Sequence, residues 1–289
     1  MEEVLKGMEN FEVVVSASGV LPTGDYENQK PLYSIKASFP NSEAKRLDEI
    51  MLALRSKVFG YLDSDYQRAM MKRIEKVRGD IRWKEKAGKI YISVTSILGW
   101  RGIDYDPYLL AQYAARGTIL HKIAEVFLIG LRDKGKGVII DPEKAKELSE
   151  QVAILKGGSL GLHWKDCSFE RFWEKHGGDF DLKGSSIEEP IFNETYLYCG
   201  TPDLVCNHEK VRTVCDWKTS SNYSDERLIG HWKQLSAYAR AKGAGKMAIL
   251  PLNPKNKSGF GKPIIEENVG KYFRMFVKER ETFRKYFQM

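Results

Sequence analysis

The chain has 289 residues, of which 42% are hydrophobic and 29% charged, a composition typical of a globular protein with a sizeable core. It contains no apolar run of the roughly 20 residues that cross a membrane, and its beginning shows no signal or transit pattern. We therefore expect no membrane partner and a cytoplasmic protein. The net charge of +7 suits a polyanion such as nucleic acid, although ordinary solvated faces explain it equally well.

Residues 1–86 read as an N-terminal accessory region, a candidate DNA clamp or protein-partner surface. The expected elements are strands at Phe11–Ser18 and Pro31–Phe39, a helix capped by Asn41 or Ser42, and a second, basic helix near Asp65–Arg78. The polar stretch Lys84–Lys89 marks the boundary with a second domain.

Residues 87–289 predict an α/β (α+β) domain in which helices flank a mixed central sheet. The expected elements are a strand with a turn or short helix in Ile90–Trp100, a helix beginning at Pro107, helices near Pro142–Lys156, Ser168–His176 and Asp225–Lys242, a strand in Lys246–Leu252 and a C-terminal helix at Glu267–Phe287.

The four cysteines have no CxxC spacing, and a chain of this size without a secretion signal is not a disulfide framework. We expect buried free thiols at Cys167, Cys199, Cys206 and Cys215.

The stretch GTPDLVCNHEKVRTVCDWKTS (Gly200–Ser220) reads as a β-hairpin that carries two acids and an amine in an apolar setting. A four-residue loop at Asn207–Lys210 pairs Cys206 with Val211 and sets Asp203 opposite Val214.

In that register Asp216 is the diagonal neighbour of Asp203, and Lys218 shares their face by the period of two. The opposite face, which we expect in the core, carries Leu204, Cys206, Val211, Thr213, Cys215 and Trp217.

Two converging carboxylates supply the hard oxygen ligands that Mg²⁺ and Mn²⁺ prefer. Beside such an ion, the ammonium of Lys218 can orient a water or offset charge on a phosphate. In isolation, however, the Asp216-x-Lys218 pattern fits a surface ion pair as well.

The order Pro202-Asp203, then Asp216-x-Lys218, resembles the signature of the PD-(D/E)xK nuclease superfamily, whose core is restriction-endonuclease-like. Further motifs resemble its RecB-like branch: Gly117-x-x-x-His121 and Gln234-x-x-x-Tyr238. Taken alone, each motif has another interpretation: His121 fits a hydrogen-bonded histidine in the core, and Gln234 and Tyr238 fit a polar–aromatic edge of a helix.

The branch also has a glutamate on the strand before the Pro-Asp motif. Glu189 is our choice for it, although spacing does not separate it from Glu188. Together with SVTSIL (Ser93–Leu98), these motifs most resemble the subgroup of the mitochondrial genome maintenance exonuclease and its phage-encoded relatives. The resemblance covers about Ile90–Ala241.

The resemblance implies a Mg²⁺- or Mn²⁺-dependent deoxyribonuclease, an exonuclease acting on single-stranded or end-processed DNA in replication, recombination or repair. The implied metal ligands are His121, Asp203 and Asp216, and the other implied catalytic residues are Lys218, Glu189, Gln234 and Tyr238. Some members of the branch hold an iron–sulfur cluster, which we do not expect because no cysteine precedes His121 or follows Tyr238.

Two basic segments with aromatics, His231–Lys233 and Lys271–Phe287, are candidates for phosphate contacts and base stacking, although core packing explains most of the aromatics. The alternatives are a structure-specific endonuclease of the same fold and a DNA-binding module without catalysis.

Overall fold

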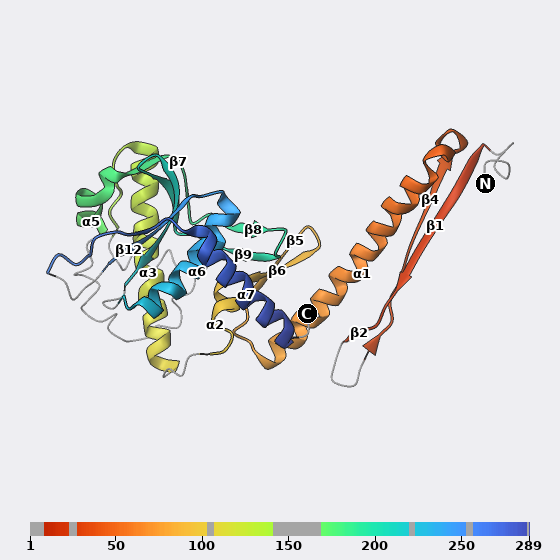
Figure 1. Ribbon diagram of the computed structural model, residues 1–289, viewed down its shortest axis with the longest axis horizontal. Coiled ribbons are helices and arrows are strands. Elements are labelled where there is room, and N and C mark those ends of the chain that lie inside the picture. The colour runs from red at the N-terminus through yellow and green to blue at the C-terminus, as the bar shows by residue number, and fades with distance from the viewer. Residues whose placement is uncertain are drawn as a thin grey trace. The chain divides into compact units, whose positions relative to one another are not determined.

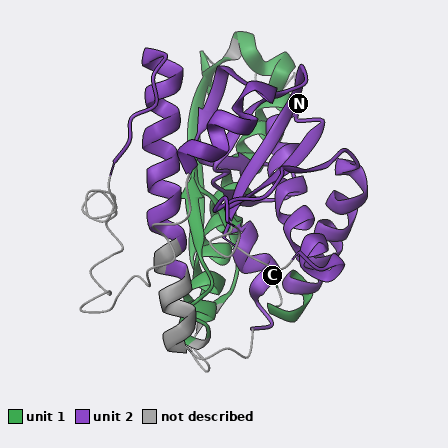
Figure 2. Ribbon diagram, turned by 90° about the vertical axis from the view of Figure 1, so that its left-hand side faces the viewer, with its two compact units in different colours: residues 1–92, 284–289 green, residues 93–283 purple. Residues whose placement is uncertain are grey.

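The computed structural model describes residues 9–22, 28–102, 107–140, 169–219, 223–252, 257–287 and 289. The chain folds as two units, one formed by residues 1–92 and 284–289 and the other by residues 93–283 (Figure 2). The helix expected near Pro142–Lys156 and the thiol of Cys167 lie outside the described residues.

In the first unit a long β-hairpin packs on one helix (Figure 1). β1 (Asn10–Ser18) pairs antiparallel with β4 (Leu32–Pro40), and the short strands β2 (Leu21–Pro22) and β3 (Asn28–Gln29) pair between them. Every second residue of β1 is buried, as its alternating sequence predicts. The buried set of β1, which packs with Val58 of the helix, is Phe11, Val13, Val15 and Ala17.

One helix, α1 (Leu47–Val77), replaces the two that we expected, so that prediction is wrong. A 3₁₀ segment, η1 (Asn41–Arg46), precedes it, and Arg46 rather than Asn41 or Ser42 stands at the N-cap of α1. Gly60 lies inside the helix. A glycine there costs about 1 kcal/mol relative to alanine, which does not break a helix whose inner face is packed.

β5 (Trp83–Lys86) and β6 (Lys89–Ser93) form a second hairpin, which turns at Ala87 and Gly88 with positive φ. The predicted boundary between residues 86 and 87 falls in this turn. The two units divide between residues 92 and 93, before the last residue of β6.

The second unit contains a mixed five-stranded sheet (Figure 1). Its strands, in spatial order, are β13 (Ile264–Glu266), β12 (Lys246–Pro251), β11 (Val211–Lys218), β10 (Leu204–His208) and β7 (Phe180–Ile187). β11 and β12 are parallel and the other neighbours antiparallel. A short hairpin, β8 (Ile191–Asn193) and β9 (Tyr198–Gly200), connects β7 with β10.

Helices flank this sheet, so the predicted α+β class with a mixed central sheet is confirmed. They are α2 (Val94–Gly99), α3 (Pro107–Lys134), α5 (Phe169–His176) with the 3₁₀ turn η4 (Gly177–Asp179), α6 (Asp225–Lys242) and α7 (Val269–Phe287). α3 and α5 bury apolar side chains against one face of the sheet, where Cys215 and Trp217 lie. α6 packs against β11 and β12.

The thiols of Cys199, Cys206 and Cys215 are free and buried, as expected. The Sγ atoms of Cys206 and Cys215 lie 3.9 Å apart inside the core of the second unit. Of the helices in the described ranges, none combines the length and the apolar character needed to span a bilayer.

Candidate functional site

β10 and β11 are joined by a two-residue turn, Glu209–Lys210, so the predicted four-residue loop at Asn207–Lys210 is wrong. The φ angles of Glu209 and Lys210 are 48° and 67°, as in the primed turns whose twist suits two-residue hairpins. Those turns favour Asn and Gly, and this one has neither, so the sequence carried no signal for it.

The observed register differs from the predicted one by two residues, since His208 rather than Cys206 pairs with Val211. A shift of two keeps each side chain on its face of the sheet. Leu204 pairs with Cys215, so the same register continued by one residue sets Asp203 opposite Asp216. The two acids are therefore direct cross-strand neighbours rather than diagonal ones.

The core face of the hairpin is largely as predicted. Leu204, Cys206, Cys215 and Trp217 all belong to the core of the second unit, and Thr213 is fully buried. Val211 is the exception and is exposed, because it directly follows the turn.

Asp203 is a buried carboxylate held by the opposite strand. Its Oδ2 atom accepts a 2.7 Å hydrogen bond from the backbone N–H of Trp217. Its backbone oxygen accepts a 3.1 Å hydrogen bond from the N–H of Glu188. The side chain of Asp203 is thus oriented by β11, and its main chain ties the end of β7 to the beginning of β10.

Glu188, and not Glu189, joins Asp203. Glu188 follows β7 directly and has a φ of 50°, a left-handed conformation that costs a non-glycine residue about 1–2 kcal/mol. Such strain persists only where the surrounding structure offsets it. Glu189 is more than half exposed and pairs instead with Lys242 at 2.5 Å, outside the cluster, so the structure does not bring our chosen glutamate to the site.

His121 reaches this cluster from α3. Its Nδ1 atom lies 3.2 Å from Oδ1 of Asp203 and 3.7 Å from Oε1 of Glu188. Burial alone would lower the pKa of His121, but the charge and hydrogen bond of Asp203 and the hydrogen bond of Glu188 outweigh it and raise this pKa from 6.5 to about 10. The two acids thus favour a positive charge at this point.

Asp216 and Lys218 form a buried ion pair next to this cluster. Lys218 Nζ lies 2.5 Å from Oδ2 of Asp216, and the carboxylate is only 3% exposed, so the surface ion pair is not what the structure contains. Burial raises the pKa of Asp216. Burial would lower the pKa of Lys218, but the charges of Asp216 and Asp203 outweigh it and raise this pKa, so the amine is protonated at neutral pH.

Gln234 and Tyr238 face the same way on α6, as their spacing predicts, and Gln234 Nε2 donates a 3.3 Å hydrogen bond to the Tyr238 hydroxyl. Tyr238 is buried against Gly200, three residues before Asp203. A Cβ atom at Gly200 would lie 2.3 Å from the tyrosine ring. The ring therefore packs on the chain that leads into Asp203.

The donor set fits a divalent cation. His121, Glu188 and Asp203 each offer a ligand atom, and these atoms lie within 4.8 Å of one another. Asp216 is outside this group of three, although the charge of Asp203 acts on its carboxylate. Its Oδ2 atom is buried and, in spite of the nearby lysine, has no partner with hydrogen-bond geometry among the described residues.

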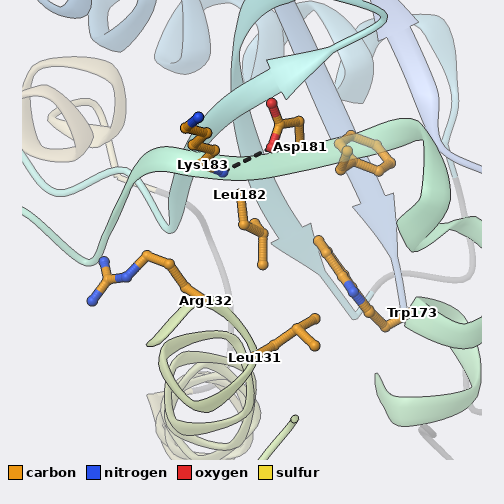
Figure 3. A pocket seen from close by; sticks show the side chains of 7 residues that line it. Leu131, Arg132, Trp173, Asp181, Leu182 and Lys183 are labelled. Atoms are coloured by element: carbon orange, nitrogen blue, oxygen red, sulfur yellow. Dashed lines mark hydrogen bonds between the residues drawn. The ribbon is translucent and has the colours of Figure 1, made fainter. Parts of the chain in front are cut away.

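A cavity of about 360 Å³ lies elsewhere in the second unit (Figure 3). It is lined by Leu131, Arg132, Trp173, Phe180, Asp181, Leu182 and Lys183. Leu131, Leu182 and Trp173 point into it, whereas the side chains of Asp181 and Lys183 rise from the other side of β7 (Figure 3). The cavity contains none of the predicted site residues and no pair of metal ligands.

A scan against protein-family models finds no match, and a search of the curated proteins finds none either. Among solved structures, one titled "Crystal structure of SSO0001" is similar over 74% of this chain and 84% of that chain, with 15% identity and a TM-score of 0.31. Because a TM-score this low does not establish a shared fold, the likeness carries no argument about function.

Proposed function

We propose that the chain is a metal-dependent deoxyribonuclease of the PD-(D/E)xK kind, an exonuclease that hydrolyses phosphodiester bonds of single-stranded DNA or of DNA with free ends. The observation that carries the proposal is that His121, Glu188 and Asp203, far apart in the sequence, gather their ligand atoms within 4.8 Å of one another. The buried pair of Asp216 and Lys218 adjoins them.

In this proposal His121, Glu188 and Asp203, with Asp216 beside them, hold Mg²⁺ or Mn²⁺. The cation would supply Lewis-acid activation of the phosphodiester. Lys218 is protonated, and its N–H groups donate to the attacking water or to a phosphate oxygen, which offsets the charge that develops in the transition state. Gln234 and Tyr238 keep the backbone before Asp203 in place.

Phosphate contacts in this proposal come from lysines and arginines rather than from stacked aromatics. Trp232, Tyr272, Phe276 and Phe283 of the two basic segments are buried, so core packing accounts for these four, whereas Tyr286 is 64% exposed. The lysines and arginines of α7 and the net charge of +7 would attract the DNA backbone over a wide surface.

The proposal is tested by incubating the protein with end-labelled linear and covalently closed circular single-stranded DNA, in the presence of Mg²⁺, Mn²⁺ or EDTA. We expect linear DNA to be degraded with either metal and to persist in EDTA. Lys218→Ala should reduce the rate by about 10²- to 10³-fold, the usual cost of losing one preorganised donor. Lys246→Ala is the matched control, because Lys246 pairs with the exposed Glu209 and Glu267.

The same assay separates the other readings of the site. If closed circles are cut as fast as linear strands, the protein is an endonuclease. If DNA is bound but not cut with any metal, it is a binding module. If cutting persists in EDTA or in Lys218→Ala, the proposed chemistry is wrong.

A further inference from the structure

The long helix of the first unit, α1, carries two apolar stripes. The stripe that packs with the β1–β4 hairpin is Ile50, Leu54, Val58 and Leu62 (Figure 1). The second stripe faces solvent and consists of Leu52, Phe59 and Tyr66, whose exposed fractions are 70%, 56% and 37%. The hairpin therefore covers only one of the two.

The exposed residues follow one another at intervals of seven. Two turns of an α-helix take about 7.2 residues, so side chains seven apart share a face and lie about 10 Å apart along the axis. The line from Leu52 to Tyr66 is thus about 21 Å long, with the spacing by which helices pack side by side in a coiled coil. A single exposed apolar side chain needs no explanation, but a line of three is typical of a surface that binds another protein.

The charge of α1 favours a protein partner over nucleic acid. The helix contains six lysines and arginines and five acids, so it lacks the positive excess that attracts phosphates. The partner is therefore expected to be apolar along the stripe and to carry both signs of charge beside it. A second copy of α1 has these properties.

Two copies of α1 match when they run antiparallel with their Phe59 side chains opposite each other. In that arrangement a residue a given number of positions before Phe59 faces the residue the same number of positions after Phe59 in the second copy. Leu52 and Tyr66 each lie seven positions from Phe59, so Leu52 of one copy faces Tyr66 of the other at both ends of the stripe. The stripe is self-complementary, as a two-fold interface requires.

The ring of Phe59 has room in this arrangement. Ser56, which precedes it by three residues, is small, and a Cβ atom at the adjacent Gly60 would meet nothing within 4 Å. A glycine inside a helix is destabilising relative to alanine, and the close approach of another backbone is a usual reason for it. The second helix passing Gly60 supplies such a reason.

The charges beside the stripe select the antiparallel direction. Arg55 and Asp63 lie four positions before and after Phe59, so each faces the other residue of the second copy. Within one copy they are about 12 Å apart along the helix, too far to pair. Arg55 makes no ion pair with any residue that the structure describes. Parallel helices would instead set Arg55 against Arg55.

We propose that the chain forms a homodimer in which two copies of α1 pack antiparallel through Leu52, Phe59 and Tyr66, with Arg55 of each copy beside Asp63 of the other. All of these residues belong to the first unit. The inference does not depend on the proposed nuclease function.

The first experiment measures the mass of the whole chain by sedimentation equilibrium. At micromolar concentrations we expect twice the 33.1 kDa of one chain. Phe59→Glu should weaken the dimer by at least about 30-fold, the usual cost of losing a central apolar anchor. Lys57→Glu is the control, because Lys57 is exposed on another face of α1, and thermal unfolding verifies that both variants fold. A monomeric wild type, or the same dissociation constant for both variants, overturns the inference.

The second experiment determines the direction of the two helices and leaves the apolar stripe intact. Arg55→Cys and Asp63→Cys are mixed and mildly oxidised, with the wild type as the control for the chain's own four cysteines. The mixture should form a disulfide-linked dimer, because the two positions face each other, and neither variant alone should do so. Cross-linking of either variant alone would indicate parallel helices, and none in the mixture would indicate another interface. Either result overturns the inference, whatever the nuclease assay shows.

Discussion

The backbone N–H of Trp217 donates a 2.7 Å hydrogen bond to Oδ2 of Asp203, so one strand of the hairpin orients the carboxylate of the other. In Asp203→Ala this buried N–H loses its acceptor, which should lower the free energy of unfolding by about 1–3 kcal/mol. Asp203→Asn keeps an oxygen at the same place and should lose much less. Urea unfolding of both variants tests this hydrogen bond. If both lose the same free energy of unfolding, the bond does not stabilise the hairpin.

The turn at Glu209–Lys210 offers a test of the observed register. Lys210 has a φ of 67°, which glycine adopts without strain. Lys210→Gly should therefore raise the free energy of unfolding by about 0.5–1 kcal/mol, the strain relieved less the entropy that glycine adds to the unfolded chain. Thermal unfolding measures the effect. If the hairpin had the four-residue loop at Asn207–Lys210 instead, Lys210→Gly would leave the free energy of unfolding unchanged or lower it.

Much of the fold is predictable from local sequence signals. The helix expected near Asp225–Lys242 has these bounds in the structure, where Ser224 precedes its acidic first turn and Gly243, with a φ of 64°, ends it. The alternation of β1 and the helix beginning at Pro107 were equally clear. In these cases the signal lies within the element itself.

The site was less predictable because it depends on backbone conformations that non-glycine residues rarely adopt. The positive φ of Glu188 breaks the alternation at the end of β7, so counting along the strand does not separate it from Glu189. The turn at Glu209–Lys210 also has positive φ at two non-glycine residues, so the sequence does not predict the strand register that this turn sets. Both conformations depend on tertiary packing. Contacts between distant parts of the chain are not visible in a single sequence.

Gly200 should tolerate no side chain. A Cβ atom there would lie 2.3 Å from the ring of Tyr238, which is buried and cannot withdraw. Gly200→Ala should therefore cost about 1–3 kcal/mol of unfolding free energy, the usual result of overpacking, and should reduce DNA cleavage by displacing Asp203. Gly230→Ala on α6 is the control, because a Cβ atom there meets nothing within 4 Å. Equal stability of the two variants would contradict the packing.

The stability of the protein should depend on His231 at acidic pH. Its pKa in the folded chain is about 4, below the ordinary 6.5, so protonation favours the unfolded state. This group's contribution is complete above pH 6.5 and is lost as the pH falls toward 4, on the order of 1–3 kcal/mol in all. His231→Gln should lose less stability than the wild type between about pH 7 and about pH 5. Chemical denaturation measures the free energy of unfolding at each pH. If the wild type and His231→Gln lose it equally as the pH falls, the fold does not keep His231 neutral.

The metal centre is tested most directly by titrating Mn²⁺ into the wild type, Glu188→Gln and Glu189→Gln in a calorimeter, without DNA. The two glutamates are adjacent in the sequence, but only Glu188 lies with His121 and Asp203, whereas Glu189 pairs with Lys242. We predict that Glu188→Gln weakens Mn²⁺ binding by about 10- to 100-fold or more and that Glu189→Gln leaves it unchanged. A wild type that binds no Mn²⁺, or a loss of affinity in Glu189→Gln alone, would contradict this account.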